Sequence, residues 1–128
     1  MSYYTHKTVE GNFDQVIEKV TSALKEEGFG VLSDIDVKST LKEKLDVDFR
    51  NYRILGACNP PNAHKALTAE PHIGLMLPCN LVVQEMEEGR IDVSAVDPKA
   101  SMAAVENPDL ESVADFIKGK LERVIHKL

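Results

Sequence analysis

The sequence lacks an excess of basic residues. Its 128 residues include 15 Lys and Arg against 21 Asp and Glu, which gives a formal net charge of −6. Binding to the phosphates of nucleic acids requires clustered cations, and the acidic balance argues against such a partner. We therefore predict that this protein does not bind nucleic acid.

Long hydrophobic runs are also missing. The longest nearly uncharged apolar run, residues 73–83, is interrupted by Pro78 and Asn80, whereas a membrane-spanning helix needs about 20 apolar residues. Residues 1–6 show no basic segment leading into an apolar one, so no secretory signal is visible. We expect a cytoplasmic protein without a membrane partner, in which Cys58 and Cys79 remain thiols because the compartment is reducing.

What is present is the composition of a folded domain. Hydrophobic residues make up 43% of the chain and charged residues 28%, both ordinary values for globular proteins. A chain of this length buries roughly two-thirds of its surface on folding, which suffices for one core. Because no linker, repeat or low-complexity tract is visible, we predict a single domain over residues 1–128.

Two long amphipathic helices are indicated. The first begins after Asn12, a good helix cap, and ends at Gly28. The second begins at Asn107-Pro108, where Asn caps the helix and Pro occupies its first position. Apolar residues recur at helical spacing in both: Phe13, Val16, Ile17, Val20 and Leu24 in the first, and Leu110, Val113, Ala114, Ile117, Leu121, Val124, Ile125 and Leu128 in the second.

The remaining segments predict about five strands and two short helices. Strands are expected at residues 2–9, 29–37 (with Phe29, Val31 and Ile35 inward), 51–57, 73–87 (broken by Pro78) and 90–97. Short helices are expected at residues 38–45, anchored by Leu41 and Leu45, and from Asn59-Pro60 to Pro71. The fold class that follows is α+β, with helices packed on one face of a mostly antiparallel sheet.

Charge is scarce in the middle of the chain. Residues 51–85 contain both cysteines and only four charged residues, namely Arg53, Lys65, Glu70 and Glu85. A segment this apolar must be buried, and the simplest interpretation places it at the centre of the sheet with its packing helix. The same features also suit a ligand pocket or a subunit interface.

Two cysteine-centred motifs lie in this segment. Residues 52–60, Tyr-Arg-Ile-Leu-Gly-Ala-Cys-Asn-Pro, and residues 74–83, Gly-Leu-Met-Leu-Pro-Cys-Asn-Leu-Val-Val, resemble the signatures of a family catalogued as domain of unknown function 302, and Asp97-Pro98 resembles a third. The resemblance implies a compact α+β fold grouped with TATA-binding-protein-like domains, commonly as homodimers, and implies no established activity. A fold grouping does not by itself carry a function.

The positions that match the two motifs are the candidate site. We predict a small-molecule pocket bounded by Cys58, Asn59, Pro60, Pro78, Cys79 and Asn80. Asn59 and Asn80 would form hydrogen bonds with the ligand, and Leu55, Leu75 and Leu77 would provide apolar walls. No cofactor is predicted. No metal is predicted either, because the two cysteines with His64 and His72 do not follow a zinc-site spacing.

Two other functions stay open. Cys58 or Cys79 could act as a thiolate in a redox or sulfur-transfer enzyme or carrier, since the start of a helix can lower the pKa of a thiol. Pro60 and Pro61 weaken this reading because they remove backbone donors there. Pro78 predicts that the chain bends or bulges beside Cys79, or that a sheet edge lies there. Alternatively, the apolar middle is only the dimer face of a structural or interaction protein, so the sequence does not decide whether this is an enzyme.

Overall fold

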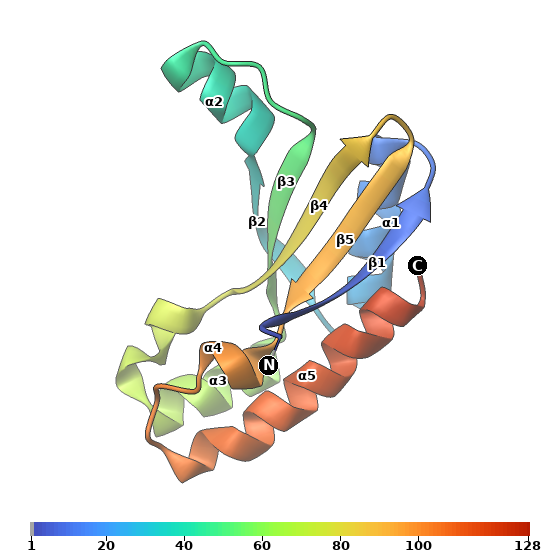
Figure 1. The fold of residues 1–128 in the computed structure, drawn as a ribbon. Coiled ribbons are helices and arrows are strands. Elements are labelled where there is room, and N and C mark those ends of the chain that lie inside the picture. Colours follow the sequence, from blue (N-terminus) through green and yellow to red (C-terminus); the bar gives the residue numbers. More distant parts are fainter. Residues whose placement is uncertain (1) are drawn as a thin grey trace.

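The computed structural model describes residues 2–128 (Figure 1). Its strands form one antiparallel sheet in the order β1-β5-β4-β3-β2. Their bounds are Tyr4–Glu10 for β1, Gly30–Asp36 for β2, Tyr52–Cys58 for β3, Cys79–Glu87 for β4 and Arg90–Val96 for β5. The α+β class and the five-stranded antiparallel sheet are therefore confirmed.

The three helix starts predicted from asparagine caps are present. The α-helices are α1 (Phe13–Glu26), α2 (Val37–Leu45), α3 (Pro60–Ala69), α4 (Pro98–Ser101) and α5 (Glu111–His126), and the 3-10 helices are η1 (Pro71–Met76) and η2 (Pro108–Leu110). Asn12 caps α1 by accepting a hydrogen bond from the Gln15 backbone N–H at 3.1 Å. Gly28 follows α1 with a left-handed φ of 84°, a conformation that glycine adopts without a Cβ clash.

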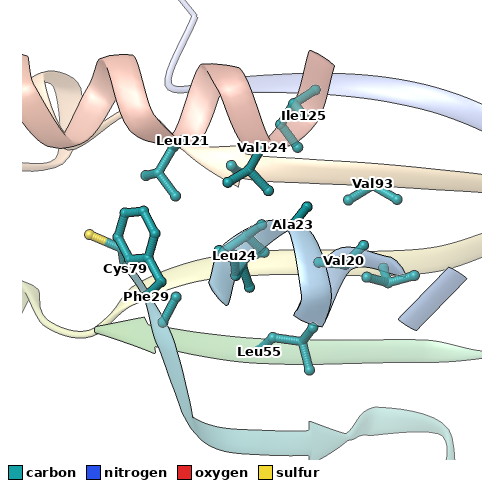
Figure 2. Packing of buried hydrophobic residues seen from close by; sticks show 14 of the residues in the cluster. Val20, Ala23, Leu24, Phe29, Leu55, Cys79, Val93, Leu121, Val124 and Ile125 are labelled. Carbon is teal, nitrogen blue, oxygen red and sulfur yellow. The ribbon is translucent and has the colours of Figure 1, made fainter. Parts of the chain in front are cut away.

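The main core lies between α1, α5 and one face of the sheet. Alternation along β5 places Ile91, Val93 and Ala95 on this face, and all three are buried as their spacing predicts. They pack with apolar residues of α1 and α5, including Leu24 and Val124 (Figure 2). A second, smaller cluster joins Ala66 of α3, Ile73 of η1 and Leu110 of η2.

The segment before β4 differs from the prediction. Residues 73–76 belong to η1 and are not extended, because Pro71 starts a helical turn that an apolar run without periodicity does not reveal. The predicted bend of the chain at Pro78 is present, whereas the alternatives, a bulge or a sheet edge, are wrong. β4 lies inside the sheet, and Pro78 directly precedes its first residue, where the missing N–H of proline removes no bond of the ladder.

The predicted anchoring of α2 is wrong as well. The helix forms between residues 37 and 45, but none of its residues is buried, and Leu45 is 66% exposed. Ile35, expected to point inward, is 49% exposed. These side chains are exposed because α2 continues from the end of the edge strand β2 and lies apart from the other helices (Figure 1).

Among the described residues, no helix combines the length and the apolar character needed to cross a lipid bilayer.

Candidate functional site

A cavity of about 330 Å³ opens between the end of the sheet and the helices α3, α4 and α5. Its floor is formed by the end of β3 and the start of β4, and none of the residues 2–128 that line it is charged. The end of β3 contributes Ala57 and Cys58, and the start of β4 contributes Cys79 with Pro78 just before it. The segment that joins these two strands contributes Asn62, Ala63, Ala66 and Leu77, among others. The hollow is therefore a pocket with almost wholly apolar walls.

Sheet pairing brings the two cysteine motifs together. Ala57 of β3 is the register partner of Cys79 of β4, so Cys58 and Cys79 lie at the same end of neighbouring strands and both line the cavity. Both are free thiols, Cys58 partly exposed and Cys79 buried. Figure 2 shows Cys79 at the end of the main core, with its sulfur turned away from the labelled residues of α1.

Burial controls the chemistry of Cys79. Removal from water raises the pKa of the Cys79 thiol to about 11, and the neighbouring Cys58 adds a smaller contribution in the same direction. A thiol in these surroundings stays protonated at neutral pH. Cys79 is thus an apolar wall of the cavity and a poor nucleophile.

Asn59 joins the cavity to the start of α3. It is the N-cap of this helix, and its Oδ1 accepts hydrogen bonds from the backbone N–H of Asn62 at 3.4 Å and from Asn62 Nδ2 at 2.8 Å. Asn59 and Asn62 are 8% and 9% exposed as whole residues, and both line the cavity. They are the polar side chains of an otherwise apolar wall.

The ring of Pro78 is held by Gly56 on β3. A Cβ built on Gly56 would lie 2.7 Å from Cγ of Pro78, closer than side-chain carbons approach one another, and would also collide with Ser33 Oγ. Glycine is therefore needed at residue 56 for the two strands and Pro78 to pack this closely.

The structure places several of the predicted site residues outside the cavity. Asn80 follows Cys79 in an extended strand and so faces the other side of the sheet, where it lines a different, more polar hollow. Pro60 is exposed at the first position of α3 and does not line the cavity. Of the predicted apolar walls, Leu77 lines the cavity, whereas Leu55 is buried in the main core and Leu75 is exposed.

Several lining residues were not predicted from the sequence. Pro98 and Met102 come from α4 and its end, and Val113 and Ile117 come from α5. A signal for α4 was present, because Asp97-Pro98 repeats the pattern of a capping side chain followed by proline. The Asp97 carboxylate accepts a hydrogen bond from the Lys99 backbone N–H at 2.9 Å.

The histidines of the charge-poor segment do not join the cavity. His64 and His72 are both exposed and absent from its lining. Within residues 2–128, no three His, Cys, Asp or Glu side chains come together in a way that could hold a metal ion.

The fold and the cavity define an α+β protein in which one antiparallel sheet carries two thiols at an apolar pocket. The model of the family "Domain of unknown function DUF302" matches residues 5–128, so the chain belongs to this family. A similar solved structure is the uncharacterized conserved protein DUF302 from Bacillus stearothermophilus, with a TM-score of 0.91 and 30% sequence identity over 99% of this chain and 98% of that one. No curated protein matches the chain.

Proposed function

We propose that this protein is a binding module for a small, mostly apolar molecule, which it holds in the cavity beside Cys58 and Cys79. The observation that carries the proposal is a hollow of about 330 Å³ without a charged residue in its lining. This volume lies within the range of small-molecule sites, roughly 300–1,000 Å³. Apolar side chains around a void lack the dispersion contacts that a ligand would supply.

The state of the thiols favours binding over thiol catalysis. A redox or sulfur-transfer reaction that uses both cysteines needs each of them as a thiolate in turn. With a pKa of about 11, the Cys79 thiol is protonated at neutral pH, so such chemistry would fall to Cys58 alone. The enzyme hypothesis is therefore the second candidate.

Titration with benzene tests the proposed site, since benzene enters dry apolar cavities of proteins. We expect the methyl NMR signals of Met102, Val113 and Ile117, which line the cavity, to shift with benzene, and those of Val20, which lies in the main core away from it, to stay. Ala63→Leu fills part of the cavity and should weaken the shifts at least several-fold.

His64→Leu is the matched control, because it places the same side chain on the neighbouring, exposed position of α3. Benzene should bind this variant as it binds the unmodified protein. Signals of the lining that do not move with benzene, or that move equally in Ala63→Leu, would show that the cavity is not a binding site.

We also propose that the protein is a cytoplasmic homodimer. Support comes from the apolar side chains around α2 that the chain itself does not cover: Ile35, Leu45 and Val47 are 49%, 66% and 42% exposed. A helix with no buried residue gains little stability from packing against the rest of its own chain. A second copy that covers these side chains would bury the apolar surface that the monomer leaves in water.

Sedimentation equilibrium tests the dimer. We expect a dimer for the unmodified chain and a dissociation constant at least tenfold higher for Leu45→Lys, because a charge replaces an apolar contact. Leu75→Lys is the control, since it makes the same exchange at an exposed leucine in η1, away from α2. A monomer at all concentrations, or equal dissociation constants for both variants, contradicts this part of the proposal.

A further inference from the structure

The two asparagines of the cavity have fixed orientations. Asn59 Oδ1 receives two N–H donors from Asn62, one from the backbone and one from the side chain. If the Asn59 amide were turned over, its Nδ2 would face these two donors, and both hydrogen bonds would be lost. The Asn59 side chain therefore presents its oxygen to α3 and keeps its N–H donors on the other side.

This arrangement leaves the Asn62 carbonyl oxygen and the whole Asn59 NH2 group free, in addition to the second N–H of Asn62. Within residues 2–128, Asn62 Oδ1 accepts no hydrogen bond, and Asn59 Nδ2 donates none. Both residues are more than nine-tenths buried, so leaving these groups unpaired is costly. Yet no side-chain N or O atom of the described residues is both fully enclosed and unpartnered. Each of the two unpaired groups therefore keeps a small accessible area, and both residues line the cavity.

The uncharged lining of the cavity restricts the ligand to an uncharged molecule. No charged side chain lines the cavity, and an ionised group moved into apolar surroundings without a counter-charge loses far more free energy than one neutral hydrogen bond returns. A neutral group that both donates and accepts matches the free Asn62 carbonyl and the free Asn59 N–H. A carboxamide or a hydroxyl has this property.

We infer that the ligand is an uncharged amphiphile, with an apolar body in the cavity and one neutral carboxamide or hydroxyl group bound by Asn59 and Asn62. This inference rests on the proposed binding function and adds the chemical class of the ligand. The apolar body packs against residues such as Ala66, Leu77 and Ile117. The head group supplies the hydrogen bonds that the two amides lack.

A matched series of benzene derivatives tests the inference by NMR titration. Benzamide and benzyl alcohol carry a neutral head group, benzoate carries a charged one, and benzene carries none. We expect benzamide and benzyl alcohol to bind about tenfold more tightly than benzene and benzoate to bind more weakly than benzamide.

The outcomes separate the inference from the function on which it rests. If benzene binds as tightly as benzamide, or benzoate binds at least as tightly, the head-group assignment is wrong while the binding function stands. If none of the four compounds shifts the signals of the cavity, both are wrong.

Asn59→Asp removes the free N–H donors and keeps the helix cap, because Asp caps helices as well as Asn does. We expect this variant to lose most of the preference for benzamide over benzene. Asn12→Asp is the matched control, since it makes the same exchange at the cap of α1, outside the cavity lining. An unchanged preference in Asn59→Asp overturns the assignment. The series on the unmodified protein decides the question if the variant does not fold.

Discussion

At the scale of single residues, Gly56 determines how closely the cavity floor packs. Any side chain at this position on β3 meets the rigid ring of Pro78, with only 2.7 Å between the added Cβ and Cγ. We expect Gly56→Ala to lower the free energy of unfolding by about 1–3 kcal/mol, as overpacking of a core does. Urea denaturation measures this change.

Gly30→Ala provides the comparison for this substitution. Gly30 also belongs to a strand, but a Cβ built there meets nothing within 4 Å. We expect its midpoint in urea to stay near that of the unmodified protein. Equal losses at residues 30 and 56 would mean that the contact with Pro78 is not the cause.

The two thiols should differ strongly in reactivity. Cys79 is buried and its thiol has a pKa of about 11, so at pH 8 only about one molecule in a thousand carries its thiolate. We expect iodoacetamide to modify the partly exposed Cys58 well before Cys79, measured by mass spectrometry of timed samples. In urea the two should react at similar rates, and similar rates in the native protein would contradict the burial of Cys79.

At the scale of elements, side-chain caps were the most reliable signal in the sequence. Asn12, Asn59 and Asn107 were predicted to begin helices, and each side chain accepts a hydrogen bond from the backbone of its helix start. A cap is a local interaction of a few residues, so the sequence carries it completely. The same reasoning applied to Asp97-Pro98 would have found α4.

Elements whose burial depends on distant partners were predicted less well. Residues 73–76 are apolar without a period, and such a run does not distinguish a strand from a tight helix. α2 has the apolar residues of a packed helix, but the sequence does not show that it continues from an edge strand beyond the other helices. Burial of Leu45 was therefore expected, although local sequence cannot decide it.

α2 should be the least protected of the longer helices. None of its residues is buried, whereas α1 and α5 each bury five, and protection from amide exchange follows burial and tertiary packing. We expect the amides of residues 40–45 to exchange at least tenfold faster than those of α1 and α5 in dilute, monomeric protein, measured by mass spectrometry. Equal protection of all three helices under these conditions would contradict this view of α2.

At the scale of the whole molecule, Glu27 connects the end of α1 to α5. Its carboxylate accepts hydrogen bonds from Lys127 Nζ at 2.6 Å and from Arg123 Nε at 2.9 Å. These bonds lower the pKa of Glu27 from 4.5 to about 2. The Glu27 carboxylate thus connects the ends of the two helices that cover the sheet, and Glu26 adds a more exposed pair with Lys127 at 3.1 Å.

The stability that Glu27 contributes should depend on pH in a defined direction. Because the folded state lowers the pKa from 4.5 to about 2, the contribution is complete above about pH 4.5 and is lost as the pH falls toward 2. Glu27→Gln should therefore destabilise the protein at pH 7 and much less near pH 2, measured by urea denaturation at both values.

Glu26→Gln is the matched control for this pH dependence. Glu26 is the neighbouring residue, its side chain is 65% exposed, and among the described residues it pairs with Lys127 alone. We expect a smaller effect at pH 7 from this exchange, as for exposed ion pairs in general. A difference between Glu27→Gln and the unmodified protein that stays constant from pH 7 to pH 2 would contradict the role of the carboxylate charge.

The candidate site could be predicted in part. Both cysteine motifs were expected to border one hollow, and Cys58, Asn59, Pro78 and Cys79 do line the same cavity. Asn80 matches the second cysteine motif, yet strand alternation turns it to the opposite face of the sheet. The walls from α4 and α5 could not be predicted, because they come from residues far along the chain whose placement depends on the whole fold.

The cavity also lies between the two hydrophobic clusters of the molecule. Phe29, Cys79 and Ile117 belong to the main core, and Ala66 belongs to the smaller cluster, while all four line the void. Val113 of α5 packs against both clusters and also lines the cavity. A ligand in the cavity would therefore contact both clusters at once, and its binding free energy would stabilise the packing of the smaller cluster against the main core.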